Sequence, residues 1–204
     1  LRDIKKAIME ASYESDTIFF TGGEPCLQRP ALLELSKFSR KLGLKIGIQT
    51  NGSNPKVIKR IIESKSLDYI SLDLKSPFDN EIFEKTTHSK TFFKQSSEIM
   101  SEIKDTLELL KKHESQLKID IRTTIVPSVM FNKEHLLRIA SQLRSIECTW
   151  ILQQYQPHLG KVHSKTLSKV NQPSFKFLEN IKESCLKVNP TLNIEIKTSG
   201  FNSY

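Results

Sequence analysis

The stretch that decides the fold is Thr17–Cys26, which reads Thr-Ile-Phe-Phe-Thr-Gly-Gly-Glu-Pro-Cys. Its apolar run leads directly into two glycines and a proline, which predicts a buried strand that ends in a sharp turn. Gly22 and Gly23 permit backbone angles that side chains would block, and they let a ligand approach the main chain closely. Glu24 places a carboxylate beside them, suited to a cationic group such as a ligand ammonium. An ordinary strand-to-loop turn would also explain the two glycines alone.

Outward from this stretch, predicted strands and helices alternate along the chain. Six strands are expected: Thr17–Thr21, Lys45–Gln49, Asp68–Leu74, Lys118–Val126, Thr149–Gln154 and Leu192–Lys197. Apolar residues at helical spacing predict helices at Leu1–Ser15, Ala31–Leu42, Pro55–Ser64, Ser97–His113, Glu134–Leu143 and Phe175–Val188. Residues Glu81–Gln95 fit a helix followed by a loop less clearly. This alternation predicts an α/β fold with a parallel sheet, either doubly wound or closed as a barrel.

Polar residues collect at the carboxyl ends of the predicted strands, the edge where active sites lie in α/β folds. Asp73 and Lys75 stand two apart, so their side chains are expected on one face of the strand. If that face is interior, two charges are buried together, which is costly unless they serve each other or a ligand. Arg122 lies in an apolar-leaning strand and could hold a carboxylate by a two-point contact. Solvated strand ends or structural ion pairs are the alternative for each residue taken singly.

The composition is that of one soluble globular domain, residues 1–204, with 37% hydrophobic and 26% charged residues. No apolar run approaches the roughly 20 residues of a membrane span. The net charge of +8 is spread along the chain, which favours a solvated surface over a nucleic-acid site. The three cysteines, Cys26, Cys148 and Cys185, lie far apart and lack metal-ligand spacing, which fits a reducing cytoplasm.

Taken together, the strand ends resemble the radical S-adenosylmethionine (SAM) enzymes. Thr21-Gly22-Gly23-Glu24-Pro25 is similar to that family's glycine-glycine-glutamate-proline motif. The remaining likeness is to the activating enzymes of glycyl-radical proteins, above all those of the anaerobic ribonucleoside-triphosphate reductase. Four stretches carry it in the family's order: Gln49–Gly52, Asp68–Pro77, Arg122–Pro127 and Trp150–Pro157.

The resemblance implies a partial (β/α)6 barrel, SAM as cofactor and a [4Fe-4S] cluster. It places the SAM ammonium at Gly22, Gly23 and Glu24, and the SAM carboxylate near Arg122. The other residues that it implies around SAM are Thr50, Asn51, Asp73, Lys75 and His158, with Asp73 near a monovalent cation and His158 near the adenosine.

The chain departs from the family pattern in two places. The three cysteines spaced Cys-x3-Cys-x2-Cys that bind the cluster are absent, and Cys26 is not expected to be a ligand. We therefore expect an N-terminally truncated core that lacks its first strand and the cluster ligands, which by itself would be inactive. The alternative is a degenerate relative that keeps only a SAM pocket. The second departure is Gln49, where related activases often have an acidic residue, so a cation site there would be weakened.

The function that the resemblance implies is reductive cleavage of SAM to a 5′-deoxyadenosyl radical. This radical would generate a glycyl radical on a partner anaerobic ribonucleotide reductase, with electrons from a low-potential donor in the cytoplasm. One alternative is a 7-carboxy-7-deazaguanine synthase, which carries similar glycine-glycine-glutamate-proline and threonine-asparagine-glycine stretches. A second is a cluster-free module that binds nucleic acid or an acidic protein, but no basic run interleaved with aromatic residues supports it.

Overall fold

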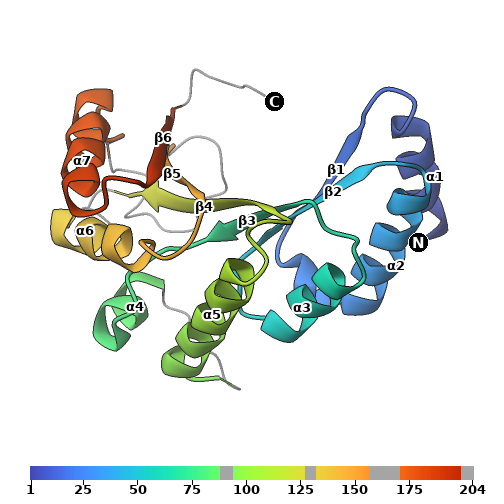
Figure 1. The fold of residues 1–204 in the computed structure, drawn as a ribbon, viewed down its shortest axis with the longest axis horizontal. Coiled ribbons are helices and arrows are strands. Elements are labelled where there is room, and N and C mark those ends of the chain that lie inside the picture. The colour runs from blue at the N-terminus through green and yellow to red at the C-terminus, as the bar shows by residue number, and fades with distance from the viewer. Residues whose placement is uncertain (88–93, 127–131, 157–170, 199–204) are drawn as a thin grey trace. The chain divides into compact units, whose positions relative to one another are not determined.

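The structure is a computed structural model that describes residues 1–87, 94–126, 132–156 and 171–198 (Figure 1). The chain forms two compact units. One comprises Leu1–Asp73 with Glu98–Asp120, and the other comprises Leu74–Ser97 with Ile121–Tyr204. Each unit is described by itself below, and the single domain expected from the sequence stays a prediction.

The six expected strands are present, and their order in the sheet follows their order in the chain. They are β1 (Thr17–Phe20), β2 (Lys45–Thr50), β3 (Tyr69–Asp73), β4 (Lys118–Ile125), β5 (Thr149–Gln154) and β6 (Asn193–Lys197). The pairs β1–β2, β2–β3 and β5–β6 are parallel. The predicted α/β fold with a parallel sheet is therefore confirmed.

Helices fill the connections between the strands, as the alternation of patterns predicts. They are α1 (Arg2–Ala11), α2 (Arg29–Lys41), α3 (Pro55–Glu63), α4 (Asn80–Thr87), α5 (Ser96–Lys111), α6 (Lys133–Gln142) and α7 (Phe175–Val188). The sequence did not predict the short 3-10 helix η1 (Pro25–Gln28), which begins directly after Glu24. In the described part of the chain, no helix combines the length and the apolar character needed to cross a membrane.

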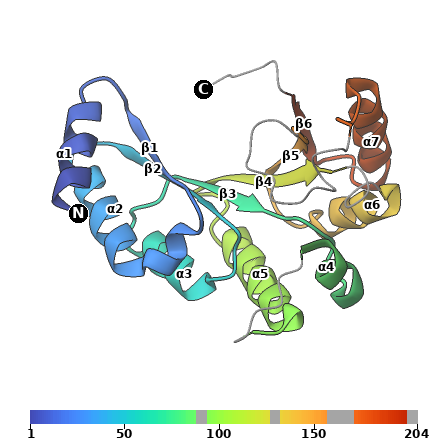
Figure 2. The same ribbon diagram turned by 180° about the vertical axis from the view of Figure 1, so that it is seen from behind.

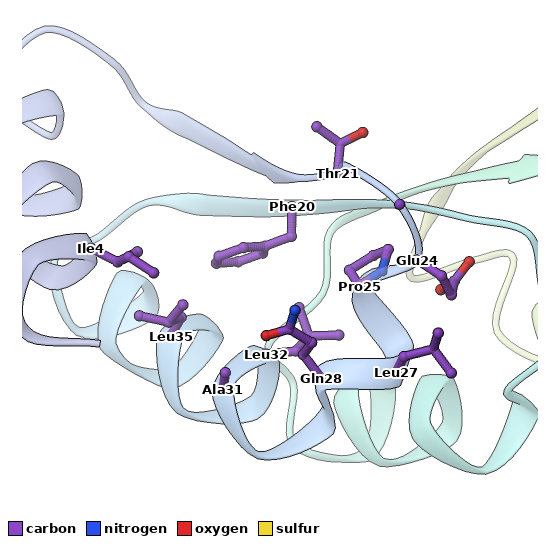
Figure 3. Close-up of a pocket in the computed structure, with 11 residues that line it drawn as sticks. Ile4, Phe20, Thr21, Glu24, Pro25, Leu27, Gln28, Ala31, Leu32 and Leu35 are labelled. Atoms are coloured by element: carbon purple, nitrogen blue, oxygen red, sulfur yellow. The ribbon is translucent and has the colours of Figure 1, made fainter. Parts of the chain in front are cut away.

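In the first unit, the alternation of side chains along β1 separates two environments. Ile18 and Phe20 pack against a cluster formed by Ile8 of α1, Leu35 of α2 and Leu44. Figure 3 shows the Phe20 ring directed toward α2, with Thr21 on the opposite side of the strand. These contacts bury apolar surface on the helix-covered side of the sheet, and this burial is the main stabilising term for the unit.

The opposite side of β1 carries the aromatic side chain of Phe19, whose position depends on the absence of a side chain at Gly47. Phe19 is 51% exposed, and its ring lies where a side chain at Gly47 would stand. A Cβ built on Gly47 would come within 2.3 Å of Phe19 Cε1. The ring centroids of Phe19 and Tyr69 are 5.9 Å apart. Gly47 is therefore needed for this close approach across the β1–β2 pair, in which it is the partner of Phe19.

In the second unit, a buried indole organises the polar core. Trp150 of β5 is fully buried, and its Nε1–H donates to Thr123 Oγ1 at 2.9 Å. The Thr123 hydroxyl donates in turn to the carbonyl of Leu74 at 2.7 Å. The indole N–H, the Thr123 hydroxyl and the Leu74 carbonyl thereby each have a partner, as burial requires. On the outside, α6 and α7 pack side by side, as Figure 2 shows from behind.

Candidate functional site

The register of the first unit places its strand ends along one edge. Phe20 of β1 is opposite Ile48 of β2, and Thr50 of β2 is opposite Leu72 of β3. The loops that follow these three strands therefore start from the same edge of the sheet. This edge carries six of the residues predicted to surround a ligand: Gly22, Gly23, Glu24, Thr50, Asn51 and Asp73.

The carboxylate of Glu24 joins two of these loops. Its Oε1 accepts hydrogen bonds from the hydroxyl of Thr50 at 2.7 Å and from the backbone N–H of Cys26 at 3.0 Å. Its Oε2 accepts from the backbone N–H of Asn51 at 2.7 Å. Glu24 thus caps η1 and also fixes the loop after β1 to the end of β2. The sequence contains a sign of the cap, because a proline at the first position of a helix commonly follows a capping residue.

Gly22 and Gly23 stand open to solvent beside this carboxylate. Gly22 has φ +124°, a conformation that favours glycine, and a Cβ built on either residue would meet no atom within 4 Å. A ligand can therefore come close to the main chain at this turn, as the sequence predicts.

Thr50 and Asn51 have structural roles that the sequence did not reveal. Thr50 is only 2% exposed, and its Oγ1 accepts from the N–H of Gly52 at 3.1 Å while it donates to Glu24. The side-chain oxygen of Asn51 accepts from the N–H and the hydroxyl of Ser53, at 2.9 and 2.7 Å. Asn51 therefore closes its own turn, and Thr50 lies beneath Glu24 instead of on the surface.

Cys26 belongs to the same hydrogen-bond network, and its side chain takes part in it as a thiol. It is buried, and its Sγ lies 3.6 Å from Thr50 Oγ1. Burial, together with the nearby Glu24 carboxylate, raises the pKa of the Cys26 thiol to about 12. Because the thiolate is the form that binds metals, Cys26 is poorly suited to be a metal ligand. Cys185 of the other unit is likewise buried, and burial raises its pKa to about 12.

A cavity of about 360 Å³ is lined at one end by Gly23 and Glu24 (Figure 3). Its lining is mostly apolar and comes from α1, the end of β1, η1 and α2, with Ile4, Phe20, Leu27, Leu32 and Leu35 among the lining residues. A charged ligand group would find polar partners only at the end of this cavity that Gly23 and Glu24 line, because apolar side chains form most of the rest. We therefore place the candidate site at the loops around Gly22–Glu24, at the edge of this cavity.

Asp73 and Lys75 do not share a strand face as the sequence predicted. β3 ends at Asp73, and Lys75 lies beyond it in the connection that begins the second unit. Asp73 is half-buried and Lys75 is exposed, so the two charges are not buried together.

Arg122 carries a buried donor that the described residues do not satisfy. It lies in β4, and its backbone carbonyl accepts from the N–H of Leu74 at 2.9 Å. Its Nε is buried, and no acceptor for it is found among the residues that the structure describes. An unpaired buried donor costs about 1–3 kcal/mol, so an anionic ligand group would be favoured there. His158, the remaining predicted residue, lies outside the described residues.

Comparisons with known proteins show the family. Residues 1–143 match the Radical SAM superfamily. The chain therefore belongs to the radical SAM superfamily. Among curated proteins, it is 33% identical over 146 residues to a protein of Methanocaldococcus jannaschii named "Putative glycyl-radical enzyme activating enzyme". That match covers 70% of this chain and 56% of the relative.

A second relative and a solved structure extend the likeness over most of the chain. An uncharacterized protein of the same organism is 26% identical over 203 residues, which is 97% of this chain and 66% of the relative. The crystal structure of a domain of pyruvate-formate lyase-activating enzyme from Bacteroides vulgatus has a TM-score of 0.61 at 17% identity. It covers 88% of this chain and 97% of that domain, and it supports the fold alone. The matches span about half to two thirds of the two relatives' lengths.

The described residues fit SAM better than they fit an iron–sulfur cluster. The Glu24 carboxylate beside the open glycines suits an ammonium, and the unpaired Arg122 Nε suits a carboxylate. In the described parts of the chain, no group of three or more His, Cys, Asp or Glu side chains could hold a metal ion. We therefore assign no cluster ligand among the residues that the structure describes.

Proposed function

We propose that this chain is the SAM-binding core of a glycyl-radical enzyme activating enzyme. The observation that carries the proposal is the Glu24 carboxylate, held by three hydrogen bonds beside an exposed double glycine in a radical SAM chain. Such a carboxylate is an anionic, oriented acceptor for the ammonium of an amino acid.

The proposed roles of the residues follow from their chemistry. Gly22 and Gly23 let the methionine end of SAM approach the main chain, and Glu24 accepts from its ammonium. Arg122 pairs with its carboxylate, which would satisfy the buried Nε. The family resemblance also assigns Asp73, Lys75 and His158 to SAM binding. Bound SAM would supply radical chemistry when a low-potential donor delivers one electron to it, and these residues would hold and orient it for hydrogen-atom abstraction from a substrate.

The subgroup assignment rests on the 33% identical relative, whose printed name is that of an activating enzyme. The stretches Arg122–Pro127 and Trp150–Pro157 support the same assignment. We propose the glycine of an anaerobic ribonucleoside-triphosphate reductase as the site of hydrogen abstraction, and a low-potential protein as the electron donor.

The experiment is anaerobic incubation of the full-length protein with dithionite, SAM and the reductase. We expect 5′-deoxyadenosine in the chromatogram and the electron paramagnetic resonance signal of a carbon-centred radical on the reductase. A reductase in which the radical-forming glycine is replaced by alanine is the control, and it should give no such signal.

Two different failures can be told apart in this experiment. If 5′-deoxyadenosine forms and the reductase stays without a radical, the proposed partner is wrong and the SAM chemistry stands. If no SAM is consumed in the presence of reductant, the proposed activity itself is wrong.

A further inference from the structure

Within the described part of the chain, the contacts of Glu24 use all but one of its acceptor positions. An ionised carboxylate offers about four lone-pair positions, two on each oxygen. Thr50 and Cys26 occupy both positions of Oε1, and Asn51 occupies one position of Oε2. One position therefore remains, on the oxygen that faces the N–H of Asn51.

The three donors differ in what can change them. Two are backbone N–H groups, of Cys26 and Asn51, which every substitution except proline retains. The third is the hydroxyl of Thr50, and it makes the 2.7 Å contact to Oε1. Thr50 is therefore the donor in this set that a side-chain substitution removes. Its removal would leave one acceptor position of Oε1 without a partner.

The Thr50 hydroxyl is itself fixed on every side. It is buried, it accepts from the N–H of Gly52 at 3.1 Å, and the Sγ of Cys26 lies 3.6 Å away. Because its single hydrogen is used on Glu24, the contact with Cys26 is a thiol S–H directed at the hydroxyl oxygen. A hydroxyl with its hydrogen and both lone pairs engaged cannot rotate without losing contacts.

We propose that Thr50 is a positioning residue that orients Glu24 for the ammonium of SAM, although Thr50 does not itself touch the ligand. This inference rests on the proposed function and adds a role that SAM binding alone does not require. Without the Thr50 hydroxyl, Oε1 would have an unsatisfied position. The carboxylate would turn to find another donor, and Oε2 would no longer be held toward the ammonium.

The test compares SAM with an analogue that lacks the amino group, using binding to the full-length protein without reductant. Thr50→Val keeps the shape of the side chain and removes the hydroxyl, and Thr50→Ser restores it. A hydrogen bond to a charged group is worth enough that Thr50→Val should weaken SAM binding about tenfold. Binding of the amino-free analogue should stay the same, because Glu24 has no partner in it. Thr50→Ser should recover most of the SAM affinity.

Thr106 offers a matched control in the same unit. It is also a buried threonine, and its hydroxyl donates to the carbonyl of Gly52 at 2.7 Å. Thr106 lies in α5, so Thr106→Val removes a buried hydroxyl that contacts the same loop without touching Glu24. It should lower the melting temperature much as Thr50→Val does, yet leave the preference for SAM over the analogue intact.

Each other outcome decides against part of the account. If Thr50→Val weakens both ligands equally, or neither, Thr50 is a structural residue only and the inference is wrong. If wild-type protein binds SAM and the analogue equally, Glu24 does not bind the ammonium, and the inference is overturned with that assignment. If the wild-type protein binds no SAM, the proposed function fails, and the inference with it.

Discussion

Trp150→Ala is expected to lower the free energy of unfolding of the second unit by about 3–5 kcal/mol, the range for removing a large buried aromatic side chain. Trp150 has no exposed surface, so the truncated side chain would leave a cavity that its neighbours fill only partly. It would also remove the donor to Thr123. Since small domains are stable by about 5–15 kcal/mol, such a loss leaves the unit close to unfolding.

Urea unfolding measures this loss of free energy. The transition is followed by circular dichroism, because the variant lacks the single tryptophan of the sequence and cannot be followed by tryptophan fluorescence. Trp150→Phe is the matched control, since it keeps a ring and removes the indole N–H. The Thr123 hydroxyl can still donate to Leu74, so Trp150→Phe should lose less than half as much as Trp150→Ala. Equal losses in the two variants would show that the indole hydrogen bond, and not the packing, is what the unit depends on.

Gly52→Ala is expected to destabilise the first unit by about 2–5 kcal/mol, the sum of backbone strain and overpacking. Gly52 has φ +78°, and a Cβ there would lie 2.5 Å from Leu72 Cδ1. Leu72 is fully buried and cannot move into solvent. The backbone at position 52 would have to move away from Leu72, and this movement would disturb the contact between the Gly52 N–H and Thr50. SAM binding should therefore weaken together with stability.

Gly43→Ala separates the two causes. Gly43 has φ +82°, but a Cβ there would meet no atom within 4 Å, so only backbone strain applies. We expect a loss of about 1–2 kcal/mol for this variant in urea unfolding. If Gly52→Ala costs no more than Gly43→Ala, the contact with Leu72 does not constrain the loop after β2.

Much of the fold could be predicted because local patterns and tertiary packing agree. The alternation of apolar residues predicted β5 and α7 with the observed bounds, and Pro55 marked the start of α3. Where the patterns and the packing differed, the error was small. The strand predicted to reach Leu74 ends at Asp73. Lys75 therefore lies two residues beyond the strand, so the strand face that Asp73 and Lys75 were expected to share does not extend to Lys75.

The site was less predictable, because it depends on contacts between residues far apart in the chain. The sequence placed a carboxylate at Glu24 and a turn at Thr50–Gly52, but these lie about 26 positions apart. No periodicity indicates that the Thr50 hydroxyl reaches Glu24, or that the N–H of Asn51 does. The unpaired Nε of Arg122 is likewise visible only when its surroundings in the sheet are known. The resemblance to the radical SAM family supplied the ligand that the residues alone left open.

The central claim is that this chain binds SAM through Glu24 and Arg122. Equilibrium dialysis of SAM against the full-length protein, with Glu24→Ala and Arg122→Ala as variants, tests it most directly. Because each change removes a charge-assisted contact, we predict that each weakens SAM binding at least about tenfold while the far-ultraviolet circular dichroism stays the same. Unchanged SAM affinity in both variants would contradict the site assignment.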